Sequence, residues 1–302
     1  PSPTIAREPR LQDGKRPCRA FIPSRTTVTS ASWPTTMRAR RRRRSGSSIT
    51  PASKPRSSFK DHHVADQGLS RLEKEIDPPT GEVTLVFTDI KDSTTLWELY
   101  PAPMRVALRM HDTIMRRSLR RIGGYEVKND GDSFMASFPN IQTALKWTCT
   151  VQKELLEADW PQEIVDSPIA TTVYHPRNPN VPLLRGLSVR MGMHVGEPFC
   201  EIHSVTERMD YTGPMVNFAA RVGSAPTGGQ IFVTPQVIQQ YAKLSQAAKD
   251  EIGPLIIYDM GMMKFKGVEK PERLFAVYLE SLAARHEILQ KEPSEPFLIQ
   301  DL

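Results

Sequence analysis

Two aspartates in this sequence each stand where a predicted strand ends. Asp89 ends the apolar run of the stretch EVTLVFTDIKDST (82–94), and Asp132 follows the turn signal NDG (129–131). Burying an ionised carboxylate costs several kcal/mol unless a partner compensates for its charge. Two carboxylates that converge repel each other unless a cation lies between them, and oxygen-only ligands suit Mg²⁺ or Mn²⁺. These residues predict a site for divalent cations.

Each aspartate also has a plainer interpretation, and both interpretations stay open at this point. Asp89 would then cap the following helix, and Asp132 would be an ordinary turn residue. The residues Asp92, Ser93 and Thr94 favour the cation site, because they are types that begin helices. Free backbone amides would therefore face the same edge and suit a polyphosphate. Two ions held there would activate an attacking oxygen and steady a leaving one in an in-line displacement.

The elements around the two aspartates must bring both to one edge of a sheet. From residue 82 to residue 196 the order is strand, helix, hairpin, helix, strand. This is the ferredoxin-like βαββαβ order, with extensions, and it predicts an α+β fold. A strand–helix–strand crossover makes its two strands parallel, so their carboxyl ends lie at the same edge. We therefore expect Asp89 and the NDG tip to share that edge.

Further elements extend this core. Helical periodicity runs through residues 94–124, closed by Gly123 and Gly124, and puts on one face Met104, Leu108, His111, Met115 and Leu119. Later predicted elements are a helix from Ile141 to about Glu157, a strand LSVRMGMHVG (187–196), a helix GPMVNFAARVGSA, a strand QIFVT, a helix near 235–244, and the closing strands IIYDMGMMKFKG and ERLFAVYL. The Pro-rich segment 160–184 is predicted to be an irregular surface insertion.

Composition divides the chain into two unlike parts. Residues 1–60 hold 15 Lys and Arg against 2 Asp and Glu, which accounts for the formal charge of +6. The segment 1–67 shows no helical or strand period and is predicted to be a disordered basic tail. Its arginine run, 38–48, is either a nucleic-acid, anionic-lipid or nuclear-import patch or a solvated segment. The three scattered cysteines argue for a reducing compartment and against a zinc site.

Several motifs then carry a resemblance to a known family. VFTDIKDST, YEVKNDGDSF and MDYTGPMVNFAAR resemble the catalytic domain of class III nucleotidyl cyclases, and LWELYP, ADWPQEIV and GGQIFVT resemble the fungal adenylate cyclases most. The resemblance implies the class III nucleotidyl cyclase fold for residues 68–283, with 284–302 as a C-terminal tail. It also implies conversion of ATP to 3′,5′-cyclic AMP and pyrophosphate in intracellular cAMP signalling.

The resemblance implies roles for particular residues of the phosphate end of the site. Asp89, Asp132 and the backbone carbonyl of Ile90 would bind two Mg²⁺ or Mn²⁺ ions. Ser93 and Thr94 begin the helix whose amides would face the triphosphate. Lys266 matches the triphosphate lysine of the family, and Lys264 is a rival for that role. No residue is a convincing dedicated general base, so Asp89, a metal-bound hydroxyl and water all stay open.

The base and ribose end has its own implied residues. Lys128 and Asp210 would read the adenine edge, because Lys donates and ionised Asp accepts hydrogen bonds, as adenine N1 and N6 require. Family members that use GTP carry Glu and a small residue such as Cys at these positions. Asn217 and Arg221 lie four residues apart on one helix face and would position the ribose and stabilise charge on the α-phosphate.

The resemblance also implies partners and a location. In the family, the metal aspartates of one subunit face the adenine-reading residues of the other, so a homodimer with two equivalent sites is expected. Fungal adenylate cyclases carry upstream regions through which Ras-type regulators act, and this sequence looks like a fragment without them. A cytoplasmic protein is expected, and a peripheral location at the plasma membrane is the alternative. No apolar run reaches the roughly 18 residues of a membrane span.

Three other classes of function compete with this interpretation. A catalytically silent domain of the same fold would sense a nucleotide or mediate dimerisation, but none of the expected ligand positions is substituted. The chain could instead be an unrelated two-metal enzyme of similar sheet architecture, but the Lys128–Asp210 pair and the motif GPMVNFAAR argue against this. A nucleic-acid-binding protein would depend on the arginine run of the basic tail, and no specific nucleic acid is expected.

Overall fold

The computed structural model describes residues 76–290 and 296–298 of the chain. The predicted basic tail, 1–67, lies outside these residues, and so does part of the predicted C-terminal tail, 284–302. Within the described part, no helix combines the length and the apolar character that crossing a membrane requires. The fold below is built from this part alone.

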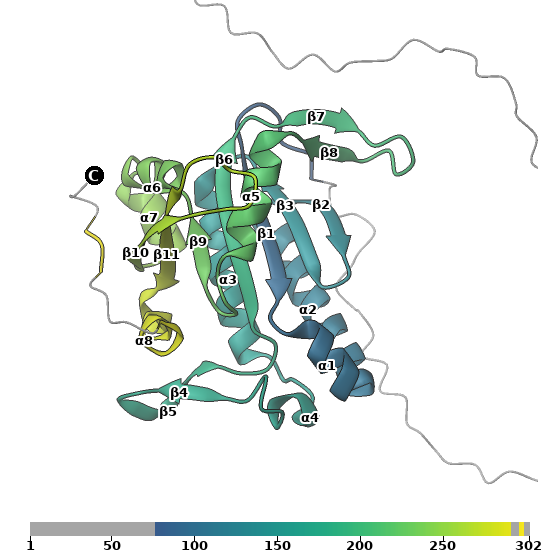
Figure 1. Ribbon diagram of the computed structural model, residues 1–302, viewed down its shortest axis with the longest axis vertical. Helices are drawn as coiled ribbons and strands as arrows, with labels where there is room; N and C mark the ends of the chain where they lie inside the picture. Colours follow the sequence, from purple (N-terminus) through teal and green to yellow (C-terminus); the bar gives the residue numbers. More distant parts are fainter. Residues whose placement is uncertain (1–75, 291–295, 299–302) are drawn as a thin grey trace, which may run out of the picture. The chain divides into compact units, whose positions relative to one another are not determined.

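Two helical layers cover the two faces of a central sheet. Figure 1 shows α2 (Pro101–Ile122) and α3 (Ile141–Glu157) against one face and α5 (Pro214–Ser224) against the other. The remaining helices border the sheet or connect its strands: α1 (Ser93–Leu99), α4 (Gln162–Val165), α6 (Pro235–Ala242), α7 (Gln246–Ile252), the 3-10 turn η1 (Glu280–Leu282) and α8 (Arg285–Leu289). The α+β class is thereby confirmed.

Seven strands form the sheet of the described residues, in the order β10-β11-β9-β6-β1-β3-β2. They are β1 (Val83–Ile90), β2 (Tyr125–Asp130), β3 (Ser133–Phe138), β6 (Val189–Gly196), β9 (Ile231–Val233), β10 (Leu255–Met263) and β11 (Glu272–Leu279). β1 pairs antiparallel with both β3 and β6, and β2 pairs antiparallel with β3. β1 and β2 therefore run in the same direction with β3 between them, and their carboxyl ends share an edge as predicted.

The pleat of β1 decides which of its side chains face the helices. Val86 and Ile90 point into the main core that α2 and α3 cover, whereas Leu85 packs in a smaller cluster on the α5 face. Since side chains alternate along a strand, Asp89 lies on the same face as Leu85. The acidic end of β1 is thus directed toward the layer that contains α5.

α5 approaches the sheet unusually closely at two glycines. A Cβ atom added to Gly192 of β6 would lie 2.2 Å from the backbone nitrogen of Gly223, and one added to Gly223 would lie 2.6 Å from Cβ of Phe87. Side chains at either position would push the helix off the sheet. The two glycines therefore set the height of α5 above β1 and β6, and with it the position of the residues that α5 presents.

The predicted helix face and its end are also present in α2. Met104, His111, Met115 and Leu119 are buried, and Leu108 is half-buried. The helix ends at Gly123, whose left-handed backbone (φ 90°) lets its N–H bond to the carbonyl of Leu119. The periodic apolar face and the glycine pair thus predicted both the packing and the end of this helix.

The insertion is more ordered than predicted. Residues 160–184 are not irregular: they contain α4 and the hairpin of β4 (Val173–His175) and β5 (Asn178–Leu184). Trp160 and Ile164 are 3% and 0% exposed and belong to the main core. The sequence did not predict that Trp160 and Ile164 pack in the core, because prolines interrupt any regular apolar period around them.

The elements that were not predicted include α7, the β7–β8 hairpin and α8. β7 (Phe199–Ile202) and β8 (Met209–Thr212) form a separate two-stranded hairpin, whose four-residue strands are too short to show a period. α8 lies inside the predicted C-terminal tail, and Arg285 and His286 at its start are each 2% exposed. The residues just after 283 are therefore part of the folded body.

Candidate active site

The acidic edge of the sheet is built from β1 and the β2–β3 hairpin. Thr88 of β1 pairs with Phe134 of β3, so Asp89 lies opposite Ser133, and the Ser133 hydroxyl donates a 2.8 Å hydrogen bond to Oδ1 of Asp89. Asp132 is the next residue toward the hairpin tip. The structure thus brings the hairpin tip to the end of β1, as the strand order predicted.

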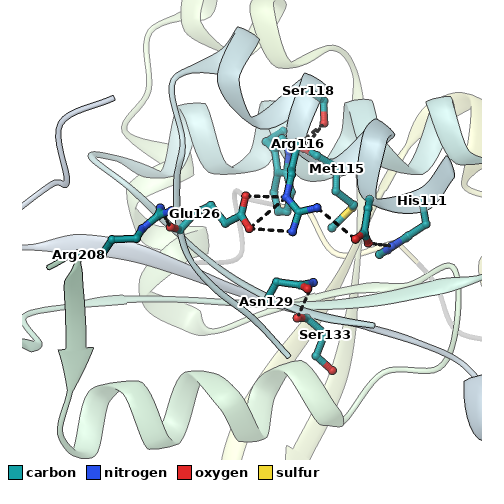
Figure 2. A network of polar contacts seen from close by, with 10 residues as sticks. His111, Met115, Arg116, Ser118, Glu126, Asn129, Ser133 and Arg208 are labelled. Carbon is teal, nitrogen blue, oxygen red and sulfur yellow. Dashed lines mark hydrogen bonds and ion pairs between the residues drawn. The ribbon is translucent and has the colours of Figure 1, made fainter. Parts of the chain in front are cut away.

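The tip itself has a fixed conformation. Gly131 takes a left-handed backbone (φ 64°), which a residue with a side chain rarely adopts. Across the tip, Nδ2 of Asn129 donates a 3.3 Å hydrogen bond to the carbonyl of Ser133, and both residues are seen in Figure 2. The turn signal NDG therefore predicts both the hairpin and the placement of Asp132 directly after it.

The charge partner of Asp89 is Arg190, which the sequence analysis missed. The two residues are register partners on β1 and β6, and both Nε and Nη2 of Arg190 donate to Oδ2 of Asp89, the first at 2.8 Å. The side chains are 33% and 28% exposed for Arg190 and Asp89. The sequence contained a signal for this partner. Arg190 is a charged residue within the predicted strand 187–196, on the face opposite the predicted apolar residues.

One carboxylate oxygen at this edge has no partner. Oδ2 of Asp132 is buried and makes no hydrogen bond with any described residue. A buried acceptor without a partner is costly, which is the situation that a bound cation relieves. Among the described residues, no group of three or more His, Cys, Asp or Glu is placed to hold a metal ion. The candidate donors at this edge are the carboxylates of Asp89 and Asp132, which are both oxygen ligands. This set fits Mg²⁺ or Mn²⁺, which keep positions for substrate oxygens.

Two neighbouring predictions have different outcomes. Ile90 is 2% exposed and its side chain packs in the main core, so its side chain takes no part in the site. Ser93 and Thr94 begin α1, as predicted, but Asp92 does not cap the helix with its side chain. Asp92 instead adopts a left-handed backbone (φ 55°), and its carboxylate lies 3.8 Å from the Lys91 ammonium. The carboxylate of Asp92 therefore makes no hydrogen bond with the helix amides.

Lys128 and Asp210 meet although they are far apart in the sequence. Nζ of Lys128 on β2 lies 3.3 Å from Oδ1 of Asp210 on β8, and the same oxygen accepts a 2.9 Å hydrogen bond from the backbone N–H of Tyr211. Lys128 is 55% exposed. An exposed donor beside an acceptor with a fixed orientation is the arrangement that a purine edge with one acceptor and one donor would match.

The predicted residues of α5 gather with the predicted triphosphate lysine. Nη1 of Arg221 donates to the carbonyl of Asn217 at 2.8 Å, and Nε donates to the carbonyl of Lys266 at 2.6 Å. Arg221 therefore links α5 to the loop between β10 and β11. The contact is with the backbone of Lys266, so it places Lys266 beside the helix and leaves its ammonium available for a ligand.

The structure therefore groups the predicted residues into three clusters: the acidic edge, the Lys128–Asp210 pair and the Arg221 cluster. No hydrogen bond or ion pair among the described residues joins Asp89 or Asp132 to Asn217, Arg221 or Lys266. Arg190 faces Asp89 and Lys128 faces Asp210, whereas no cation faces Asp132 among the described residues, and the clusters lie on elements of the α5 face or at its border. Nucleotide-binding chemistry, with cations, phosphate oxygens and a base, matches this set of groups.

Comparison with known proteins places this fold among nucleotide cyclases. A solved structure of an adenylate cyclase from Trypanosoma brucei in its monomeric state has a TM-score of 0.60 at 27% identity, covering 74% of this chain and 99% of that one. Residues 76–266, more than half of the chain, match the family model described as the adenylate and guanylate cyclase catalytic domain. The chain belongs to this family, and its fold is that of the class III nucleotidyl cyclases.

Fungal proteins are similar over most of this chain. The adenylate cyclase of Neurospora crassa is 41% identical over 266 residues, which covers 80% of this chain and 12% of that protein. The adenylate cyclase of Schizosaccharomyces pombe is 43% identical over 244 residues, which covers 76% of this chain and 14% of that protein. The chain thus spans only about an eighth of the length of these curated relatives.

Proposed function

We propose that this chain is an adenylate cyclase domain that converts ATP to 3′,5′-cyclic AMP and pyrophosphate. The ribose 3′-oxygen would attack the α-phosphorus, lose its proton, and displace pyrophosphate as the bond from the α-phosphorus to the bridging oxygen breaks. The observation that carries the choice of base is the 3.3 Å contact between Lys128 and Asp210. Family membership and the fungal relatives named adenylate cyclase support the reaction itself.

The phosphate end would be organised by the acidic edge. Asp89, Asp132 and the carbonyl of Ile90 would hold two divalent cations, Mg²⁺ or Mn²⁺, and the unpartnered Oδ2 of Asp132 supports this role. When bound, the cations would lower the pKa of the attacking hydroxyl and neutralise charge on the phosphates. Ser93 and Thr94 would offer the amides at the start of α1 to the triphosphate. The acidic edge would accelerate cyclisation by holding the phosphate oxygens and the attacking hydroxyl in place.

The α5 cluster would act on the α-phosphate and the ribose. Arg221 carries a charge that no acidic side chain of the described residues neutralises, since its two hydrogen bonds go to backbone carbonyls. Its guanidinium would stabilise negative charge that develops on the α-phosphate. Asn217, one turn earlier on the same helix face, would orient the ribose, and Lys266 would bind the terminal phosphates.

A homodimer would complete the site. Within one chain, Arg190 joins Asp89 to the carbonyl of Ser224 at the end of α5, but no hydrogen bond or ion pair of the described residues links Asp89 or Asp132 directly to Asn217, Arg221 or Lys266. We propose that the acidic edge of one subunit faces the Lys128–Asp210 pair and Arg221 of a second subunit. Because each chain carries both halves, such a head-to-tail dimer would contain two equivalent sites.

The direct test incubates the purified chain with ATP or with GTP in the presence of Mn²⁺ and identifies the cyclic product. We expect cyclic AMP from ATP and little product from GTP. The double variant Lys128→Glu with Asp210→Cys should shift preference toward GTP, because it reverses the donor and acceptor offered to the base. A wild-type chain that binds ATP and releases no cyclic product would instead be a silent nucleotide-sensing domain.

A mixing experiment tests the shared site. Asp89→Ala and Arg221→Ala should each be inactive alone, because each removes one half of both sites. Mixing the two should recover up to about a quarter of wild-type activity if subunits exchange at random, through dimers with one intact site. If mixed dimers are shown to form and no activity returns, the shared-site proposal fails, while activity of the wild type would still stand.

A further inference from the structure

The direction of Lys128 depends on an irregularity in β2. Tyr125 and Val127 both pack on the α5 face of the sheet, so alternation would send residue 128 to the opposite face, toward α2. The pairing register shifts instead: Glu126 pairs with Ala136, and Lys128 pairs with the very next residue of β3, Met135. Val127 is thus an extra residue, and this bulge turns Lys128 back to the α5 face.

The residue before the bulge is tied to α2 by an arginine. Nε of Arg116 donates to both carboxylate oxygens of Glu126, at 3.1 and 3.0 Å, and Nη2 donates to Oε1 at 3.0 Å. Nη1 of Arg116 donates to Asp112 at 3.1 Å, which fixes the guanidinium from the other side. Arg116 and Glu126 are 33% and 22% exposed, so this pair is partly shielded from water. Figure 2 shows the guanidinium of Arg116 facing the Glu126 carboxylate.

The β7–β8 hairpin, which carries Asp210, contacts β2 next to the bulge. Nη2 of Arg208 donates to the backbone carbonyl of Glu126, on the side away from Arg116 in Figure 2. The hydroxyl of Tyr125 accepts a 3.1 Å hydrogen bond from the backbone N–H of Met209. Arg208, Met209 and Asp210 thus each contact a residue of β2, and the contact of Asp210 is the one with Lys128.

We propose that Arg116 is a positioning residue for the choice of nucleotide base. With Asp112 and Glu126 it fixes the bulge that turns Lys128 toward Asp210, although it makes no hydrogen bond with either of the two itself. This inference rests on the proposed function, because it assigns a role in selecting the base to residues outside the three clusters of the site. A tie between α2 and β2 that served stability alone would affect both nucleotides equally.

The test measures binding of 3′-deoxy-ATP and 3′-deoxy-GTP with Mn²⁺, since neither nucleotide can cyclise. For Arg116→Gln we expect weaker binding of 3′-deoxy-ATP and a fall of about tenfold in the preference over 3′-deoxy-GTP. Arg116→Lys keeps the charge but not the two-pronged contact and should be intermediate. Arg117→Gln is the matched control: it removes an ion pair of the same helix, to Glu154 at 3.1 Å, and should leave the preference unchanged.

The outcomes separate this inference from the proposed function. An unchanged preference in Arg116→Gln, whatever the loss of overall affinity, would overturn the positioning role. If Arg116→Gln does not fold, Glu126→Gln removes the same contact from the other side and must give the same fall in preference. A wild-type chain that binds 3′-deoxy-ATP yet makes no cyclic AMP from ATP would reject the reaction only, and the preference would still test Arg116. Binding of neither nucleotide would overturn both.

Discussion

Arg190 and Asp89 face each other across β6 and β1, and two nitrogens of the guanidinium donate to a single carboxylate oxygen. The other oxygen of Asp89 accepts the Ser133 hydroxyl. Both oxygens that the proposed cations would need are therefore engaged within the protein. Arg190 already supplies a positive charge to Asp89. A bound cation would therefore compete with the Arg190 guanidinium for the Asp89 carboxylate.

The first prediction follows from this competition. Arg190→Gln should lower stability without added metal by roughly 1–2 kcal/mol, because the pair is only partly exposed. The stabilisation that Mn²⁺ adds should become larger than in the wild type, since Asp89 is then free to bind it. Thermal unfolding with EDTA and with Mn²⁺, in the absence of nucleotide, measures both effects. Arg273→Gln is the control, because it breaks a similar pair with Asp259 on β10 and β11 and should leave the Mn²⁺ response unaltered.

The second prediction concerns Asp132, where substitution should have the opposite effects on stability and on the response to Mn²⁺. Its Oδ2 is buried without a partner, so Asp132→Asn removes an uncompensated charge and should unfold in EDTA at the same temperature as the wild type or higher. Affinity for Mn²⁺ should fall by at least about tenfold, because an amide is a weaker ligand than a carboxylate. Asp130→Asn, at an exposed position of the same hairpin, should change neither quantity. A Mn²⁺ response that survives in Asp132→Asn would remove this residue from the cation site.

The sequence predicted what depends on local pattern. The bounds of α3, Ile141–Glu157, were predicted closely, because its apolar face is periodic and Asn140 caps it with a 2.9 Å hydrogen bond from Thr143. The shared edge of Asp89 and the hairpin tip followed from strand order alone. Both depend on interactions between residues that are near in sequence or on the parallel direction that one crossover gives to its two strands.

The contacts that the sequence did not predict depend on the register between strands that are distant in the sequence. Arg190 is a partner of Asp89 only because β6 aligns with β1 at that position, and the bulge at Val127 is visible only once β2 is paired with β3. Arg208 and Arg116 meet at Glu126 from two other elements. A single sequence gives types and spacing along the chain, whereas these contacts are fixed by how separate elements pack.

The third prediction concerns pH and His194. Burial beside Phe218 and Thr234 lowers the pKa of His194 to about 4. The unfolded chain binds a proton at about pH 6.5 and the folded protein only near pH 4, so stability is full above pH 6.5 and falls as pH drops between these values. The loss would approach about 3 kcal/mol at the low end.

Urea unfolding between pH 7.5 and pH 4.5 checks this dependence. His194→Gln should show a flatter fall in the free energy of unfolding, although it starts from a lower value because it disturbs packing. His203→Gln, in the exposed loop between β7 and β8, should keep the wild-type slope. Identical slopes for wild type and His194→Gln would mean that other groups account for the acid sensitivity.

The last prediction concerns Arg285, a buried cation held by carbonyl oxygens. Its Nε donates to Leu183 at 2.7 Å and its Nη1 donates to the side chain of Gln152 at 2.5 Å and to the carbonyl of Gly229 at 3.1 Å. Burial lowers the pKa of Arg285 to about 10, so it stays protonated at neutral pH. The start of α8 therefore holds together the insertion, α3 and the segment before β9.

Removing this guanidinium leaves buried carbonyl groups without donors. Arg285→Met should lower the free energy of unfolding by roughly 2–4 kcal/mol, measured by urea denaturation at pH 7.5. A chain ending at residue 283 should lose at least as much, because it also lacks His286, which stacks on Tyr258 at 3.6 Å. Arg177→Met is the control: this exposed arginine reaches the same helix through Glu287 at 3.4 Å, and its loss should cost under about 0.5 kcal/mol. If the chain ending at 283 were as stable as the longer one, α8 would be a peripheral addition, and the domain would end where the sequence alone placed it.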